Sequence, residues 1–164
     1  MIRLRTIAYR PFHAGLRAIL FVGPAILLLV GLLNTASPAG WIVAGVAVAM
    51  LVVITFFSGV RIRADETSVA VSLVPFWGKR LRWSDVTSVV VEDVRPFEDF
   101  GGWGIKGTQK KHGILLSAGD TRSIRFTLID GRRYLVAVGE GAEAAVRDLA
   151  DLAPRKPGDT RFAK

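Results

Sequence analysis

The feature that most constrains this chain is a long stretch without charge. No Asp, Glu, Lys, Arg or His occurs from Ala18 to Val60, whereas charged residues recur every few positions afterwards. A helix needs about 20 apolar residues to cross the roughly 30 Å hydrocarbon core of a bilayer. Two runs of suitable length, residues 18–36 and 39–58, flank a short connector rich in turn-forming residues. The sequence therefore predicts a transmembrane two-helix hairpin over residues 18–58.

Two other interpretations of these runs are weaker. Buried helices of a soluble protein carry a polar stripe, but these runs are apolar on all sides. A signal peptide would need a better cleavage site than Ser37-Pro38-Ala39, and a second span follows immediately. Small residues recur at Gly40-xxx-Ala44 and Gly45-xxx-Ala49. We expect them to pack the hairpin against itself rather than to form a dimer interface.

The positions of the arginines predict the orientation of the hairpin. Residues 1–17 hold four arginines and no acid, Arg61 and Arg63 follow the second span, and the connector holds no Lys or Arg. Because positively charged flanks stay in the cytoplasm, we expect a cell-membrane protein with both termini cytoplasmic and residues 1–17 as a basic N-terminal flank. Half of the net charge of +8 lies in that flank, so the charge does not indicate nucleic-acid binding.

A change of period predicts a β-rich domain over residues 59–153. Alternation of apolar and polar residues replaces the apolar runs, and Asp130-Gly131 is a hairpin signal. Residues 95–111 have no regular pattern, residues 140–152 form an amphipathic helix, and the polar tail 154–164 is expected to be disordered. The expected strands are Val60–Arg63, Ser68–Val74, Arg80–Trp83, Val86–Val94, Gly113–Ser117, Arg122–Ile129 and Arg133–Val138.

Three segments of this domain resemble bacterial pleckstrin-homology-like (PH-like) domains. They are Arg82–Val89, with its Trp-Ser-Asp-Val core, Asp99–Lys106, similar to the GGWG stretch of small actinobacterial membrane proteins, and Asp130–Val136. Such domains are often attached to paired membrane helices. The resemblance implies an α+β fold, a bent seven-stranded antiparallel sheet or partial barrel with a C-terminal capping helix. It also implies a binding module without a settled ligand.

The glycine-rich loop around Trp103 is the first candidate contact site. Gly102 to Gly107 matches GxGxxG, but no helix follows to receive a phosphate, so we expect no nucleotide cofactor. The aromatic residues either anchor the loop inward or project outward, rimmed by lysines, to a protein partner or the membrane surface. The candidate partner-binding residues are Phe100, Trp103, Lys106, Lys110 and Lys111.

Lys79, Arg80 and Arg82 form a second candidate site. They are either a solvated strand face or a contact for anionic lipid headgroups.

The residues for catalysis are few. There is no cysteine, the two histidines, His13 and His112, have no partner at metal-ligand spacing, and no serine lies in a nucleophile elbow. We therefore expect no enzyme, no metal and no cofactor. The sequence favours a membrane-anchored interaction module that docks a protein partner at the inner face of the cell membrane. The alternative is a lipid-facing sensor or envelope structural protein.

Overall fold

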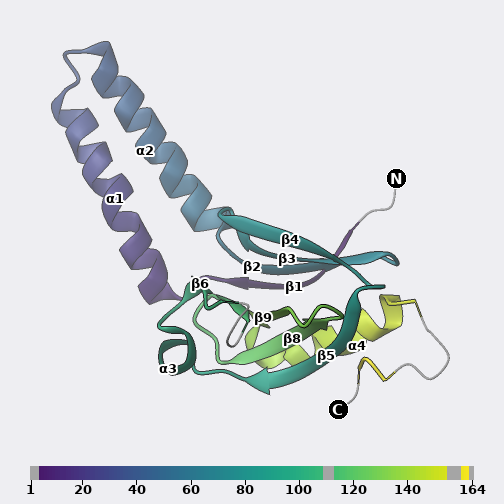
Figure 1. Cartoon of the computed structure of the whole chain (residues 1–164). Coiled ribbons are helices and arrows are strands. Elements are labelled where there is room, and N and C mark those ends of the chain that lie inside the picture. The colour runs from purple at the N-terminus through teal and green to yellow at the C-terminus, as the bar shows by residue number, and fades with distance from the viewer. Residues whose placement is uncertain (1–3, 109–112, 155–159, 163–164) are drawn as a thin grey trace. The chain divides into compact units, whose positions relative to one another are not determined.

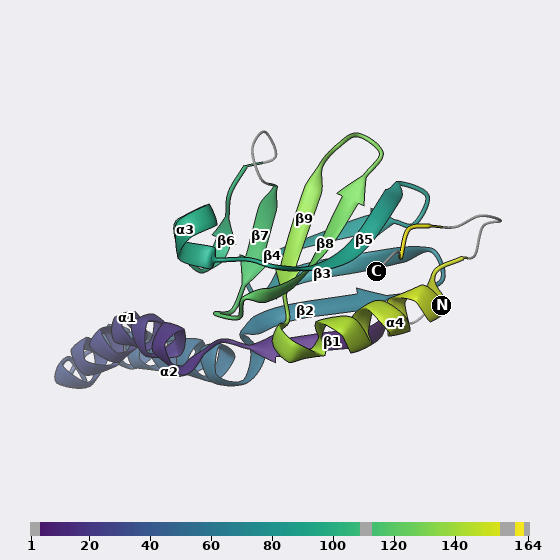
Figure 2. The same ribbon diagram turned by 90° about the horizontal axis from the view of Figure 1, so that it is seen from below.

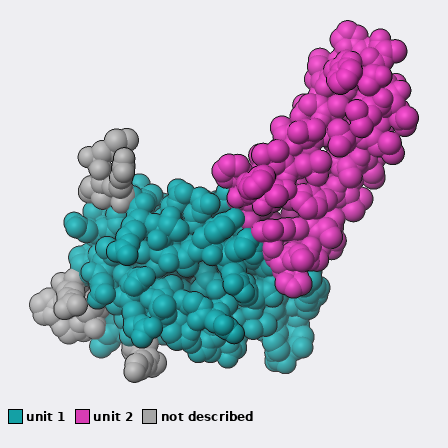
Figure 3. Space-filling model, turned by 180° about the vertical axis from the view of Figure 1, so that it is seen from behind, with its two compact units in different colours: residues 1–11, 59–164 teal, residues 12–58 magenta. Residues whose placement is uncertain are grey.

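The computed structural model describes residues 4–108, 113–154 and 160–162. The chain divides into two compact units, coloured separately in Figure 3. Residues 12–58 form one unit, called here the hairpin, and residues 1–11 and 59–164 form the other, called the β domain. The β domain is therefore discontinuous in sequence, because the hairpin is inserted between its first strand and the rest.

The hairpin consists of α1 (Ala14–Leu33) and α2 (Pro38–Phe57), as the apolar runs predict. A cap defines the start of α2, where the Ser37 hydroxyl accepts a hydrogen bond from the Gly40 N–H at 3.2 Å. By length and composition, both helices are able to cross a membrane. Only 11% and 22% of their most apolar windows are buried, so the rest of the described chain does not cover them. The helices are compatible with a membrane location.

Small residues bring the two helices together. Gly40 and Ala44 of α2 are buried, and so is Gly31 of α1. A Cβ atom on Gly31 would lie 2.7 Å from the Ala44 nitrogen, so a side chain there would push the helices apart. By contrast, Gly45 is exposed and has nothing within 4 Å of a built Cβ. The first small-residue pair therefore packs the hairpin against itself, and the second does not.

The first sheet of the β domain has four antiparallel strands in the order β1-β2-β3-β4 (Figure 1). The strands are β1 (Arg5–Pro11), β2 (Gly59–Ala64), β3 (Ser68–Val74) and β4 (Trp77–Arg82). Strand β1 is a difference from the sequence-based expectation of a separate basic flank over residues 1–17. It pairs with β2 from Arg5 opposite Ala64 to Pro11 opposite Gly59, although the hairpin separates the two strands in the sequence.

The second sheet has five strands in the order β5-β8-β9-β7-β6. They are β5 (Val86–Asp93), β6 (Gly104–Lys106), β7 (Ile114–Ser117), β8 (Arg122–Leu128) and β9 (Arg133–Ala137). The expectation of an entirely antiparallel, seven-stranded sheet is wrong, because β7 and β9 pair in parallel. The chain reverses direction between β7 and β8 and again between β8 and β9, so β7 and β9 run in the same direction. Part of the segment expected to be irregular forms the short helix α3 (Pro96–Phe100) and β6.

The two sheets stack, and α4 (Ala142–Leu152) contacts β1 of one sheet and β5 and β8 of the other (Figures 1 and 2). The fold is thus α+β with a C-terminal helix, as expected. Trp83 and Phe126 are the largest fully buried side chains of the core. Within the tail that was expected to be disordered, Arg161 is buried and donates to the carbonyl oxygens of Trp83 and Pro154 at 3.1 and 2.7 Å.

Candidate functional site

The loop around Trp103 is built on α3, a helix of one and a half turns with a fixed start and end. The carboxylate of Asp99 accepts a hydrogen bond from the Arg95 N–H at 2.9 Å, which satisfies one free donor at the start. At the other end, the N–H groups of Gly101 and Gly102 donate to the carbonyl oxygens of Phe97 and Pro96 at 3.1 and 2.8 Å. The local hydrogen bonds therefore hold α3 in one conformation.

Phe100 is the inward anchor of this loop. Its half-buried ring packs against a core cluster of Val94, Leu115 and Leu135. Gly107, with φ +88°, passes so close to the ring that a built Cβ would lie 2.8 Å from Cδ1 of Phe100. The sequence left open whether the aromatic residues anchor the loop inward or project outward, and Phe100 anchors it inward.

Phe97 and Trp103 form the outward part of the loop, called here the aromatic pair. Their ring centroids are 4.8 Å apart and their planes are inclined at 76°, an edge-to-face contact. The side chain of Phe97 is 60% exposed and Trp103 is half-buried. Exposed Ile105 and Lys106 follow on β6. Lys110 and Lys111, the other predicted contact residues, lie outside the described residues.

The second candidate site, the basic cluster of β4, does not point in one direction. Lys79 lies opposite the core residue Val71 in the ladder, so its side chain leaves β4 on the inner side. Arg80 and Arg82, both exposed, leave the strand on the outer side. The structure therefore brings the two arginines together and separates them from the lysine.

Asp65, in the turn between β2 and β3, holds Arg80 in place. The Asp65 side chain is only 2% exposed, and its Oδ2 lies 2.8 Å from the Arg80 guanidinium. Its other oxygen accepts hydrogen bonds from the N–H and hydroxyl groups of Thr67 and Ser68, at 2.7–3.1 Å. Burial favours a raised pKa for Asp65, but these hydrogen bonds outweigh it and hold the pKa well below its ordinary value. The Asp65 carboxylate is therefore a permanent charge at physiological pH.

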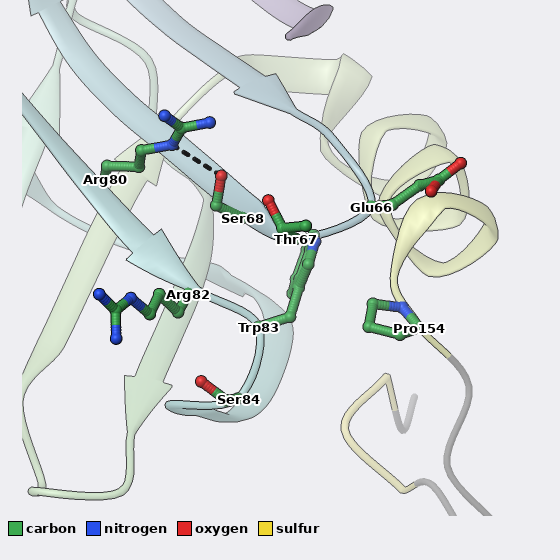
Figure 4. Close-up of a pocket in the computed structure, with 8 residues that line it drawn as sticks. All are labelled: Glu66, Thr67, Ser68, Arg80, Arg82, Trp83, Ser84 and Pro154. Carbon is green, nitrogen blue, oxygen red and sulfur yellow. Dashed lines mark hydrogen bonds between the residues drawn. The ribbon is translucent and has the colours of Figure 1, made fainter. Parts of the chain in front are cut away.

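An open pocket of about 580 Å³ lies beside this network (Figure 4). Arg80 also donates from Nε to the Ser68 hydroxyl at 2.8 Å, which fixes its position at the pocket edge. Buried Trp83 also lines the pocket and donates from its indole N–H to the Asp65 carbonyl at 2.8 Å. The lining residues are Glu66, Thr67, Ser68, Arg80, Arg82, Trp83, Ser84 and Pro154. The hydroxyls of Thr67 and Ser68 already donate to Asp65, so the guanidinium groups of Arg80 and Arg82 are the lining groups that suit an anion.

Several acidic residues from Glu92 onward form ion pairs with arginines. The pairs are Glu92 with Arg125, Asp93 and Glu143 with Arg122, Glu98 with Arg95, and Asp130 with Arg132. Hydrogen bonds from Arg122 lower the pKa of Glu143. In the described part of the chain, no three His, Cys, Asp or Glu side chains gather as they would around a metal ion. His13 caps α1, accepting a hydrogen bond from the Gly15 N–H, and His112 lies outside the described residues.

No family model matches this sequence, and neither a curated protein nor a solved structure is similar to it. The local geometry is therefore the basis for any functional assignment. Sequence reasoning did not single out Phe97, although its spacing of three from Phe100 places the two on neighbouring faces of one helical turn. It did not single out Asp65 either, because burial of a carboxylate leaves no signature in sequence.

Proposed function

We propose that this chain is a non-catalytic, membrane-anchored interaction module. In this proposal the hairpin crosses the cell membrane with both termini in the cytoplasm. The β domain is a divergent PH-like module, a suggestion supported by its two stacked sheets, its closing helix and the buried Trp83 of the resembling segment. The parallel pairing of β7 with β9 departs from the resemblance.

The observation that carries the proposal is the aromatic pair, in which Phe97 is exposed and Trp103 half-buried, together with the helix α3 that supports it. Phe97 is 60% exposed, yet local hydrogen bonds hold both ends of α3, and Phe100 packs against the core cluster. Binding energy at protein interfaces concentrates in such aromatic residues, because a preorganised ring loses little entropy when a partner covers it. Lys106 beside the pair adds a positive rim that favours an acidic partner surface.

The test is crosslinking and affinity purification of the tagged full chain from its native membranes. Phe97→Ala and Trp103→Ala are each expected to reduce recovery of one specific partner by about tenfold or more, since hot-spot truncations cost about 2 kcal/mol or more. Phe76→Ala is the matched control, because Phe76 is a phenylalanine of similar exposure, 57%, in the turn between β3 and β4.

Recovery of the same partner in equal amount from both loop variants would contradict the proposal. A partner lost equally in the Phe76→Ala control would also contradict it, because the loss would then not belong to the aromatic pair. Correct folding of each variant is checked by comparing its far-UV circular dichroism in detergent with that of the wild type.

A further inference from the structure

Charge is divided unequally between the two sheets of the β domain. Strand β1 holds two basic residues, β2 two and β4 three, and none of strands β1 to β4 holds an acid. Of the 14 acidic residues in the chain, only Asp65 and Glu66 precede Asp85. The other 12 acids therefore lie at Asp85 or beyond, and arginines of the second half of the chain pair with several of them.

The strand register collects four arginines on the outer side of the first sheet. Val60, Ile62 and Ala64 of β2 face the core, so Arg61 and Arg63 between them face outward. Ala70 lies opposite both Arg63 on β2 and Arg80 on β4, and Ser68 lies opposite Arg82. This surface, called here the arginine face, comprises Arg61, Arg63, Arg80 and Arg82.

Small residues separate the arginines of this face, and neighbouring groups neutralise the charges of these arginines to different degrees. The residues between the arginines are small, namely Ser68, Ala70, Ser72 and Gly78. Arg80 is paired with Asp65, and the guanidinium of Arg61 lies 4.9 Å from the ring centroid of Tyr9 on β1. Among the described residues, neither Arg63 nor Arg82 has a carboxylate within ion-pair distance. The face thus keeps the positive charges of Arg61, Arg63 and Arg82, which no carboxylate of the described chain pairs with.

We propose that the arginine face binds the anionic phospholipid headgroups of a bilayer. Guanidinium groups form paired hydrogen bonds with phosphate, and each basic residue near an anionic leaflet contributes about 1 kcal/mol of attraction. Arg61 follows the last residue of α2, Phe57, by four positions, so at most about 14 Å of extended chain separates them. If α2 spans the membrane, this tether keeps the face at high effective concentration near the lipid.

This inference uses a surface separate from the aromatic pair and stands or falls independently of partner docking. It differs from the sequence-based candidate cluster, since Lys79 lies on the inner side of β4 and Arg61 and Arg63 join the site.

The experiment places a single fluorescent label on the face of the full chain in lipid nanodiscs. The chain has no cysteine, so Ala70→Cys gives a unique attachment point between Arg63 and Arg80. Headgroup-quencher lipids report its contact with the bilayer, and Ala144→Cys on exposed α4 is the control position. With about one third phosphatidylglycerol, quenching of the Ala70→Cys label is expected to exceed that in pure phosphatidylcholine about twofold or more. It should fall at about 1 M salt, where the Debye length is about 3 Å.

Charge reversal provides the decisive comparison. Arg63→Glu with Arg82→Glu is expected to abolish the excess quenching, whereas Arg147→Glu, an equal charge change per residue on exposed α4, should preserve it. Equal quenching in anionic and neutral discs would overturn the inference, as would quenching that survives the double reversal. Loss of the excess on adding millimolar inorganic phosphate, at unchanged ionic strength, would assign the arginines to a soluble anion and also overturn it.

Discussion

At the scale of single residues, Asp65 shows how a turn acid can become part of the core. Its carboxylate accepts hydrogen bonds from Thr67 and Ser68 and pairs with Arg80, while its own carbonyl receives the indole N–H of Trp83. Removing it would leave buried donors without partners, which costs about 1–3 kcal/mol for an unsatisfied group. Asp65 therefore links the β2–β3 turn to β4 and to Trp83, which directly follows β4.

We expect Asp65→Ala to lower the free energy of unfolding by about 2–4 kcal/mol at pH 7, because several donors lose their acceptor at once. Since folding lowers the pKa of Asp65, its contribution is fully present above the unfolded pKa of about 4 and is lost as pH falls through the folded value. The destabilisation should therefore shrink below about pH 4. Thermal unfolding in detergent at several pH values measures this, with exposed Glu66→Ala as a control expected to change stability by less than about 0.5 kcal/mol.

A destabilisation by Asp65→Ala that stayed constant from neutral to acid pH would show that the carboxylate charge is not what the turn requires.

Single residues also show where prediction from sequence stopped. The glycine-tryptophan loop was identified from its composition, but the roles of its rings were open, and Phe97 was not considered. The structure assigns Phe100 to the core cluster and leaves Phe97 exposed beside Trp103. Which of two rings on one helical turn is buried depends on the surface beneath them. That surface is formed here by nearby Val94 and by two residues distant in sequence, Leu115 of β7 and Leu135 of β9.

At the scale of elements, the hairpin is the part of the fold that sequence predicted best. Length and apolarity depend only on local composition. The bounds of α2 are within one residue of the predicted ones, whereas α1 begins four residues and ends three residues earlier than predicted. The Asp130-Gly131 turn between β8 and β9 was also predicted from local composition. In the structure, Gly131 has φ +80° and its N–H donates to the Leu128 carbonyl at 2.9 Å.

The proposed orientation of the hairpin is testable with single cysteines in the cysteine-free chain. Thr35→Cys, in the exposed connector, should react with a membrane-impermeant thiol reagent in intact cells, because the arginine-free connector is expected outside. Ala144→Cys on α4 should react only after the cells are opened. Labelling of Ala144→Cys in intact cells, with Thr35→Cys protected, would reverse the proposed topology.

Strand β1 is the element that sequence did not predict. Its arginines were assigned to topology alone, but Arg10 also forms two hydrogen bonds with Asp120, at 2.9 and 3.0 Å. Those bonds raise the pKa of Arg10 and tie β1 to the loop between β7 and β8. A single short strand whose partner follows only after two helices has no local signal.

At the scale of the whole molecule, insertion of the hairpin makes the β domain depend on both sides of it. Pro11 and Gly59 are neighbours in the β1–β2 ladder, so the two ends of the domain are close enough for a short Gly-Ser linker. A chain of residues 4–11 linked to residues 59–164 should therefore fold as a monomer without the hairpin.

The comparison is with residues 59–164 alone, in which β2 would become an unprotected edge strand and Asp120 would lose Arg10. We expect this shorter chain to melt about 10 °C or more below the linked chain, since 1 kcal/mol corresponds to about 4–8 °C in a domain near this size. Calorimetry and light scattering measure the two. Equal melting temperatures with both chains monomeric would show that β1 is dispensable.

Some features of this fold therefore follow from local sequence patterns, and others arise only when segments distant in sequence pair. Apolar runs, strand alternation and turn glycines act within a few residues, so the chain's order of helices and most strands follows from its sequence. Only the folded structure adds β1 to the first sheet, makes β7 parallel to β9 and gathers Arg61, Arg63, Arg80 and Arg82 on one face. The reason is physical: a strand's face is set by local alternation, but its neighbours are set by which distant ladder leaves the fewest backbone groups unpaired.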